Sequence, residues 1–292
     1  METGTFESAF GYDLATYRWQ VDDPKFIFYL SHGYGEYTAS KAYTREFIGR
    51  VQKLGGAVYG HDHFAHGESG PYAKDHAERC LVKNFQESAE DLKKRLQDFL
   101  AGHSMGGLIS LIAIEAEQNR PDIQGLLLLS AAIKIHPDAG PGWLLALAKI
   151  AGCFTPWIKP PRTFGVETVT RNKENYSWLE EQGKEYGDNG GPNLGFISRM
   201  LTAQNDFQKW LKSGKFPKNI PTFIATGTDD FITDIAGSSL AAENINDSKL
   251  FKYEGAYHAL HNELPEVTNR FYEDMTSWIE NQLKKHSQKS QK

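Results

Sequence analysis

The sequence has little cysteine, no excess of basic charge and no long apolar run. Its 292 residues include two cysteines, Cys80 and Cys153, which cannot form a disulfide framework and fit a reducing compartment. Acidic residues outnumber basic ones, and the formal charge of -5 argues against nucleic acid as a partner and against electrostatic attachment to anionic membranes. No run approaches the roughly 20 apolar residues that a membrane-spanning helix needs.

The first residues, 1–7, lack the basic start and apolar core of a signal peptide. Together with the cysteine usage, this predicts a cytoplasmic protein. Hydrophobic residues make up 40% of the chain and aromatic residues 12%, which is enough to fill a sizeable core. Large α/β domains reach this length without dividing, so we expect one main domain.

Short apolar runs of strand length recur between helical patterns. The clearest are residues 26–30, 57–60, 99–101, 125–129, 221–227 and 249–253. Continuous apolar runs are typical of strands covered on both faces, and their alternation with helices favours a mostly parallel sheet flanked by helices. We expect residues 1–130 and 218–284 to form this α/β core as one discontinuous domain.

The alternation stops between residues 131 and 217. This interval is too long for an unstructured loop, so we predict an inserted, mainly helical cap (a lid) over the strand ends. Within it, residues 142–151 are apolar on nearly all sides, which fits either a buried helix or a lid helix that contacts lipid. The polar, basic residues 285–292 are expected to form a disordered tail.

The motif Gly-His-Ser-Met-Gly at residues 102–106 stands between an apolar run and an apolar helical stretch. A strand, a tight turn and a helix with serine at the apex form the nucleophile elbow, Gly-x-Ser-x-Gly. Ser104 would need a strained backbone there, and the flanking glycines avoid a clash across the bend. The helix amino terminus that follows favours a developing negative charge.

Two later strand ends offer the partners that a serine nucleophile needs. The hydroxyl becomes reactive when a histidine takes its proton and a carboxylate orients that histidine. Asp229 and Asp230 follow the run 221–227, and His258 follows the run 249–253. This is the chain order of the α/β-hydrolase triad, and strand ends are where such sheets gather their sites.

The loop 31–36 is the first that could carry chemistry. In the α/β-hydrolase fold, the loop after this strand supplies one backbone N–H of the oxyanion hole, and the residue after the nucleophile supplies the other. We assign these donors to Tyr34 and Met105. Each such donor is worth about 10²–10³ in rate.

The segment 61–66 offers a rival interpretation, because its three histidines and one aspartate could bind zinc. A complete site would need more ligands from distant loops, and the triad already uses the histidine at the suitable strand end. We therefore expect a hydrogen-bonded turn here and no metal.

Together these motifs resemble the monoacylglycerol lipase branch of the serine α/β-hydrolases, which is often grouped with lysophospholipases. The resemblance covers most of residues 8–282. It is carried by the stretches 31–36, 61–69, 102–107, 171–173 and 253–265. It implies an α/β-hydrolase fold, hydrolysis of monoacylglycerols to fatty acid and glycerol through an acyl-enzyme, and no cofactor.

The resemblance also implies roles for single residues. The family's acid ends a Gly-x-x-Asp turn, which selects Asp230 over Asp229. It places backbone donors at Tyr34 and Met105, an apolar tunnel under the cap, and Glu36 near the polar pocket for glycerol. The residues expected to contact substrate are Gly33, Glu36, His103, Leu144, Leu147 and Tyr257.

Three departures from the family pattern keep alternatives open. The stretch 85–101 before Ser104 is several residues short, Ala65 stands where glycine is usual, and residues 186–189 lack an Asp-Pro-Leu pattern. The short stretch could misplace Ser104, which motivates the alternative of a ligand-binding member of the fold with weak catalysis. A lysophospholipase or a small-ester carboxylesterase would use the same triad, whereas a serine at the apex disfavours an aspartate-nucleophile hydrolase.

The expected partner is a lipid ester, with no nucleic acid. The apolar side chains of residues 142–158 further predict peripheral contact with membranes or lipid droplets.

Overall fold

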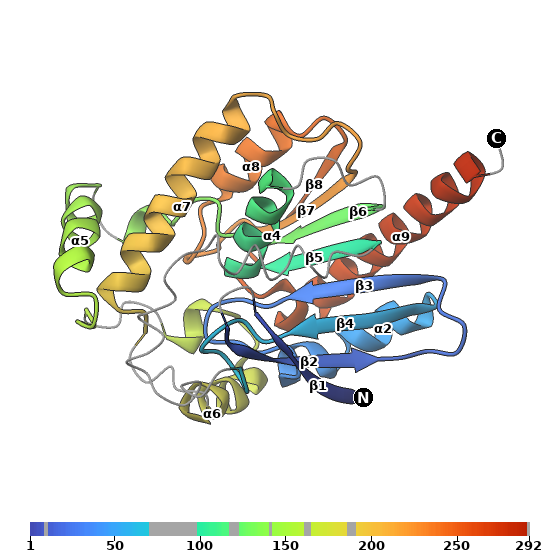
Figure 1. The fold of residues 1–292 in the computed structure, drawn as a ribbon, viewed down its shortest axis with the longest axis horizontal. Helices are drawn as coiled ribbons and strands as arrows, with labels where there is room; N and C mark the ends of the chain where they lie inside the picture. Colours follow the sequence, from blue (N-terminus) through green and yellow to red (C-terminus); the bar gives the residue numbers. More distant parts are fainter. Residues whose placement is uncertain are drawn as a thin grey trace.

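An eight-stranded sheet organises the part of the chain that the computed structural model describes, residues 1–8, 11–69, 98–116, 123–139, 142–160, 165–185 and 191–290. The strand order is β1-β2-β4-β3-β5-β6-β7-β8 (Figure 1). The strands are β1 (Glu2–Glu7), β2 (Asp13–Trp19), β3 (Phe26–Ser31), β4 (Gly56–His61), β5 (Phe99–His103), β6 (Gly125–Leu129), β7 (Thr222–Gly227) and β8 (Ser248–Tyr253). β2 pairs antiparallel with β1 and β4, and the other neighbouring pairs are parallel. The predicted mostly parallel sheet is confirmed.

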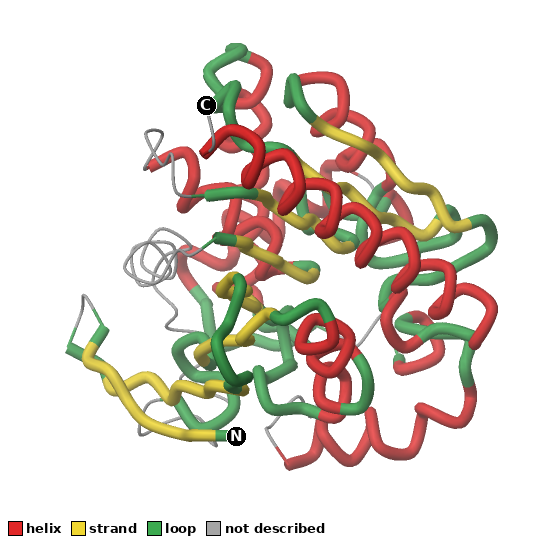
Figure 2. The backbone as a smooth tube through the Cα atoms, turned by 90° about the vertical axis from the view of Figure 1, so that its right-hand side faces the viewer, coloured by secondary structure: helices red, strands yellow, loops and turns green. Residues whose placement is uncertain are grey.

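Helices cover both faces of this sheet, and the strands pass between them (Figure 2). α4 (Met105–Ala116), α7 (Leu194–Lys212) and α8 (Ile235–Asn244) pack with one apolar cluster. α1 (Lys41–Thr44), α2 (Phe47–Lys53) and α9 (Pro265–Ser290) pack with the other. The α/β-hydrolase arrangement of a helix-flanked sheet is therefore present.

The strand β6 shows why apolar runs predicted this sheet well. All five of its residues are buried. Leu126 and Leu128 belong to the cluster on one face, and Leu127 and Leu129 belong to the cluster on the other. Successive side chains of a strand point to opposite faces, so a strand covered on both faces is apolar at every position.

The central strand β5 holds its place although it is short. Its Leu100 lies opposite Tyr29 of β3 and Leu126 of β6, in parallel register on both sides. Residues 85–97 of the shortened stretch lie outside the described residues, as do residues 186–189. The described end of the stretch nevertheless delivers the nucleophile motif to the middle of the sheet.

The predicted cap interval contains α5 (Gly142–Phe154), α6 (Tyr176–Glu185), α7 and short 3-10 turns. α5 lies outside α7, away from the sheet (Figure 1). The contact is close at Gly152, where a Cβ atom would lie 2.2 Å from Leu194 O. The Ser198 hydroxyl also donates to Lys149 O at 2.8 Å.

α5 is not a buried helix, so of the two interpretations of this segment the buried one is wrong. Gly152 is its one buried residue. Large apolar side chains on one side of α5 are 44–76% exposed. This α5 apolar face consists of Trp143, Leu144, Leu147, Ile150 and Phe154. Apolar composition alone could not tell the two cases apart, because both kinds of helix are rich in the same residues.

The expectation of a disordered tail from residue 285 is also wrong, at least as far as Ser290, where α9 ends. Residues 291–292 lie outside the described part. After Pro265, which suits a first helical turn, the segment holds no glycine or further proline to stop a helix. Lysine and glutamine are good helix formers, so α9 continues although its last turns are exposed.

Of the helices described, none combines the length and hydropathy needed to cross a bilayer.

We predict that Leu127→Ala destabilises the protein by about 2–5 kcal/mol, because the side chain is fully buried and its loss leaves a cavity in the core. Leu144→Ala, on the exposed α5 apolar face, should change the free energy of unfolding by no more than about 0.5 kcal/mol. Urea unfolding followed by circular dichroism measures both. Equal losses in the two variants would contradict the assignment of Leu127 to the core.

Candidate active site

Ser104 occupies the turn between β5 and α4 in a strained backbone conformation. Its φ is 51°, in the left-handed region that non-glycine residues rarely adopt. A Cβ at Gly102 would lie 2.5 Å from Gly106 O, and one at Gly106 would lie 2.2 Å from Ser31 O. Both glycines of the motif are therefore required by close backbone contacts, as expected for a nucleophile elbow.

Backbone hydrogen bonds fix this turn on both sides. Ser104 N–H donates to Leu129 O at 2.9 Å. Ser104 O accepts from Ala132 N–H at 2.9 Å and from Gly107 N–H at 3.0 Å. The strained serine is thus held by β6, by the chain that follows β6, and by the first turn of α4.

His258 and Asp230 form a buried pair at the ends of β8 and β7. His258 Nδ1–H donates to Asp230 Oδ2 at 2.7 Å. Thr233 supports the same carboxylate, donating from its backbone N–H at 2.9 Å to Oδ1 and from its hydroxyl at 2.7 Å to Oδ2. Burial would raise the pKa of Asp230, but the charge and hydrogen bond of His258 and the Thr233 donors lower it overall. Asp229 instead accepts from the Thr228 hydroxyl at 3.1 Å, so the structure brings Asp230, not Asp229, to the histidine.

The elbow and the Asp–His pair meet through His103, the residue before the serine. The His103 and His258 rings lie 4.9 Å apart between centroids. Met105, on the other side of Ser104, is buried at the start of α4. The three predicted triad residues therefore follow the carboxyl ends of the parallel strands β5, β7 and β8, with β6 between β5 and β7.

The loop after β3 packs directly against the elbow. A Cβ at Gly33 would lie 3.2 Å from Ser104 Cβ and 3.1 Å from His103 Nδ1. Beside it, the Tyr34 ring packs on Phe196 of α7 at 4.4 Å between centroids. This loop thus brings Tyr34 close to Ser104, on whose other side Met105 lies. We expect the backbone N–H groups of Tyr34 and Met105 to form the oxyanion hole there.

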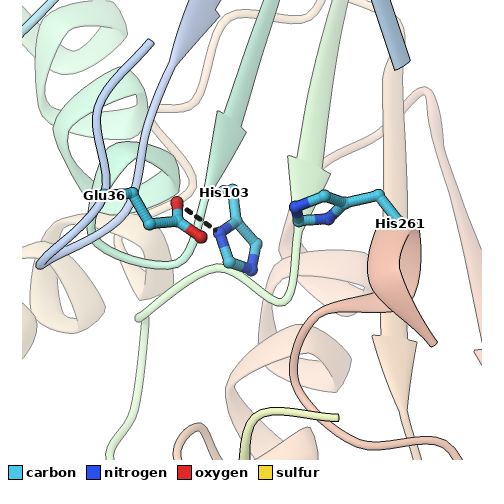
Figure 3. A group of neighbouring side chains, drawn as sticks. All are labelled: Glu36, His103 and His261. Atoms are coloured by element: carbon cyan, nitrogen blue, oxygen red, sulfur yellow. Dashed lines mark hydrogen bonds and ion pairs between the residues drawn. The ribbon is translucent and has the colours of Figure 1, made fainter. Parts of the chain in front are cut away.

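Glu36 turns its carboxylate inward, toward the elbow (Figure 3). Its Oε2 accepts from Gly33 N–H at 2.7 Å and from His103 Nδ1–H at 3.0 Å, and it also accepts from the Tyr43 hydroxyl. Burial opposes the charge, but His103 and Tyr43 hold the pKa of Glu36 well below its usual range. Burial would lower the pKa of His103, but the charge of Glu36 and its hydrogen bond raise it overall. Glu36 therefore orders the Gly33 turn.

His261 was not among the predicted site residues, yet it completes this group. Its ring stacks on Tyr43 at 5.1 Å with an angle of 10° between planes, and meets the His103 ring edge-on at 4.8 Å. Neither ring nitrogen has a hydrogen-bond partner among the residues that the structure describes. Burial and the neighbouring His103 charge lower the pKa of His261 to about 3. The stretch 253–265, which carries part of the family resemblance, contains His261, whereas no motif of the sequence includes Tyr43.

Within the described residues, Glu36, His103 and His261 are the group whose ligand atoms could surround a metal ion, all lying within 4.8 Å of one another. Their geometry is that of a hydrogen-bonded network. Glu36 Oε2 already accepts three hydrogen bonds, and one of them uses His103 Nδ1. A metal would have to displace these contacts, so we assign the group to ordering the loop and the elbow.

The histidine-rich segment 61–66 forms the hydrogen-bonded turn that we expected. His61 Nδ1 bonds the Tyr29 hydroxyl at 2.7 Å, and His63 Nε2 bonds the Ser31 hydroxyl at 3.0 Å. Asp62 accepts from the backbone N–H groups of Thr38 and Glu68 and from the Tyr17 hydroxyl. Ala65 takes a φ of 59°, which explains why glycine suits this position.

The remaining expected substrate contacts lie in two places. Leu144 and Leu147 are on the α5 apolar face, at the outside of the molecule. Tyr257 precedes His258, with its ring 5.0 Å from Phe231. The structure brings Gly33, Glu36 and His103 together at the elbow and leaves the two leucines apart from them.

We predict that His261 makes the protein sensitive to acid. Between about pH 6.5 and pH 3 the unfolded chain binds a proton at this histidine that the folded chain does not, so the free energy of unfolding falls as the pH drops through this window. Between pH 6.5 and pH 5 the wild type should lose about 2 kcal/mol more than His261→Phe, which keeps the ring on Tyr43. Urea unfolding at each pH measures this difference, and equal pH slopes would contradict a neutral buried imidazole.

Comparisons with known proteins identify the family of this chain. The family model described as serine aminopeptidase, S33, matches residues 22–265. The monoglyceride lipase of Rattus norvegicus is 29% identical over 273 residues, covering 89% of this chain and 84% of that protein. A monoglyceride lipase homolog of monkeypox virus is also 29% identical, covering 89% and 91%.

Solved structures show the same fold. A soluble variant of monoglyceride lipase from Saccharomyces cerevisiae, in complex with a substrate analog, superposes with a TM-score of 0.75 at 21% identity, covering 96% of this chain and 94% of that one. The resemblance to monoacylglycerol lipases is thereby confirmed. The chain belongs to the serine aminopeptidase S33 family, has the α/β-hydrolase fold, and is a carboxylic ester hydrolase.

Proposed function

We propose that this hydrolase cleaves monoacylglycerols to glycerol and free fatty acid, using Ser104, His258 and Asp230 as its triad. The observation that carries the mechanism is the buried 2.7 Å hydrogen bond between His258 and Asp230, beside a strained serine at the elbow. The substrate class is supported by the monoglyceride lipases among its relatives and by the exposed α5 apolar face.

In the first half of the proposed reaction, His258 Nε2 takes the proton of the Ser104 hydroxyl as Oγ attacks the ester carbonyl carbon. Asp230 remains ionised, holds Nδ1–H and stabilises the imidazolium. The backbone N–H groups of Tyr34 and Met105 stabilise the oxyanion. The tetrahedral intermediate collapses, and glycerol leaves with the proton from His258.

In the second half, His258 removes a proton from water, which attacks the acyl-enzyme carbonyl. The oxyanion forms again in the same place, and collapse breaks the bond to Ser104 Oγ. The serine regains its proton from His258, and the fatty acid is released. The reaction consumes one ester and one water and needs no cofactor.

For substrate binding, we propose that the glycerol end lies near Gly33, Glu36, His103 and Tyr257, where polar groups gather beside the elbow. The acyl chain would pass under the cap formed by residues 131–217, over the core formed by residues 1–130 and 218–284. Leu144 and Leu147 would meet the acyl chains of a lipid surface. We propose peripheral attachment to membranes or lipid droplets from the cytoplasm.

The first prediction of this proposal is that the wild type releases oleate from monoolein and that Ser104→Ala does not. Loss of the nucleophile should lower kcat by on the order of 10⁶, because the triad acts as a unit. Oleate release is followed by chromatography, with diolein and lysophosphatidylcholine as parallel substrates. Faster hydrolysis of lysophosphatidylcholine would favour a lysophospholipase, and a folded protein inactive on every ester would favour a ligand-binding protein.

The second prediction concerns the α5 apolar face. Leu147→Asp should weaken flotation with phosphatidylcholine vesicles and slow hydrolysis of vesicle-borne monoolein, because it places a charge among side chains meant for lipid. Hydrolysis of a water-soluble short-chain ester should stay unchanged. Asn281→Asp adds the same charge at an exposed site on α9 and serves as the control. Unaltered flotation of Leu147→Asp would rule out this docking face.

A further inference from the structure

The loop that carries His258 is held by a segment of the predicted cap. The peptide groups on both sides of the histidine are anchored. Tyr257 N–H donates to Glu263 Oε1 at 3.0 Å, and Ala259 N–H donates to Val169 O at 2.9 Å. Asp230 fixes the ring of His258, whereas these two bonds fix its backbone.

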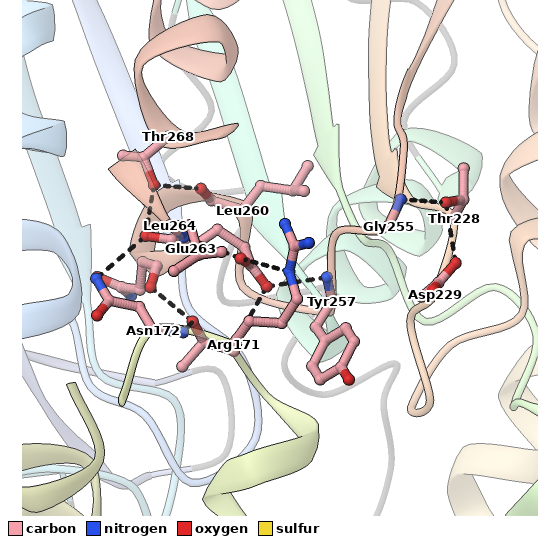
Figure 4. A network of polar contacts seen from close by, with 12 residues as sticks. Arg171, Asn172, Thr228, Asp229, Gly255, Tyr257, Leu260, Glu263, Leu264 and Thr268 are labelled. Carbon is pink, nitrogen blue, oxygen red and sulfur yellow. Dashed lines mark hydrogen bonds and ion pairs between the residues drawn. The ribbon is translucent and has the colours of Figure 1, made fainter. Parts of the chain in front are cut away.

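Glu263 is the centre of this arrangement (Figure 4). It is 2% exposed, and its carboxylate accepts four hydrogen bonds. Arg171 donates from its backbone N–H at 3.1 Å to Oε1 and from Nε at 3.1 Å to Oε2. Tyr257 N–H and Leu264 N–H supply the other two. A buried carboxylate needs a cation and a full set of donors, and here both requirements are met.

Arg171 also reaches the histidine loop by a second route. Its guanidinium carbon lies 5.9 Å from the centre of the Tyr257 ring. A Cβ at Gly255 would lie 3.3 Å from the arginine Nη1. One side chain of the cap interval therefore contacts the chain on the amino-terminal side of His258 as well as Glu263 on its carboxyl-terminal side.

Neighbours of Arg171 extend the contact. The Thr170 hydroxyl and the Asn175 side-chain amide both donate to Asn262 O, at 2.8 Å and 2.7 Å. Asn172 Nδ2 donates to Glu263 O at 3.3 Å. We call residues 169–175 the histidine strap, because their contacts with the histidine loop (residues 254–264) run from Gly255 to Glu263.

We propose that Glu263, oriented by Arg171 of the histidine strap, is a positioning residue that places the His258 backbone for proton transfer with Ser104. This inference rests on the proposed function. A general base must stay within hydrogen-bond reach of the proton that it takes, and a misplacement of 1 Å can cost about 100-fold in rate. Glu263 does not touch the reacting atoms and acts through Tyr257 N–H.

The first test is Glu263→Gln, which keeps the size of the side chain. The amide oxygen can still accept, but the NH₂ group faces two N–H donors in either orientation, those of Arg171 Nε and Leu264 or those of Arg171 N and Tyr257, so the loop must shift. We expect kcat on a soluble ester to fall about 10- to 100-fold with KM changed less than about threefold. The rate at which a fluorophosphonate labels Ser104 should fall by the same factor as kcat. Thermal melting shows that each variant is folded at the assay temperature.

Arg171→Met provides a second variant at a half-buried site outside the histidine loop. It removes the cation and should lower kcat in the same direction. Because both residues act through one contact, the double variant should be no slower than the slower single variant. Asp274→Asn is the matched control, since it removes a carboxylate that accepts from the Tyr253 hydroxyl and pairs with Arg270 on α9. It should leave kcat and labelling unchanged.

The outcomes separate this inference from the proposed function. Labelling of Ser104 in the wild type tests whether the serine is activated, before any change at Glu263. An unlabelled wild type would overturn both the proposed function and the positioning role. If the wild type is labelled and Glu263→Gln lowers only the melting temperature, with kcat and labelling unchanged, the positioning role is overturned. The positioning role is supported if Glu263→Gln lowers both kcat and the labelling rate while Asp274→Asn changes neither.

Discussion

The close approach of α4 to the end of β3 is the contact on which the site depends. Glycine at 106 lets the first turn of α4 pass the Ser31 carbonyl without a side chain between them. The loop carrying Gly33 then reaches Ser104, and the sheet pairings of β3 and β5 keep the two strand ends level. The strain at Ser104 is maintained by this surrounding structure, as strained functional turns generally require.

Two hydrogen-bonded carboxylate–histidine pairs lie beside the elbow, and both histidines are buried. Glu36 holds His103, and Asp230 holds His258, with the two rings 4.9 Å apart. Each acid has a lowered pKa because its histidine and other donors outweigh the cost of burial. His261 differs, because it stays neutral and packs by its ring faces and edges. The site therefore gives each of these two carboxylates a buried histidine as hydrogen-bond partner.

Much of this could be predicted from the sequence, and the limits have physical causes. Strands buried on both faces leave continuous apolar runs, so β3, β5 and β7 and the residues that follow them were visible. The edge strand β8 is only partly buried and was visible through the motif that follows it. Exposure was not visible for α5, because a helix packed on one partner and a helix packed all round can share one composition. Contacts such as Tyr43 on His261, or Glu263 on Tyr257 N–H, join residues by tertiary packing that no local spacing records.

Because of the histidine strap, the interval 131–217 cannot be exchanged as one independent unit. The interval 131–217 looks like an insertion that could be exchanged as a block, yet residues 169–175 share a buried acid and several backbone bonds with the histidine loop. A graft that brings in a foreign cap must therefore keep these seven residues with the recipient core. Helix α5, which packs on α7 and keeps its apolar face exposed, is the part free to diverge, whereas α7 places Phe207 and Leu211 in the core and must stay with it.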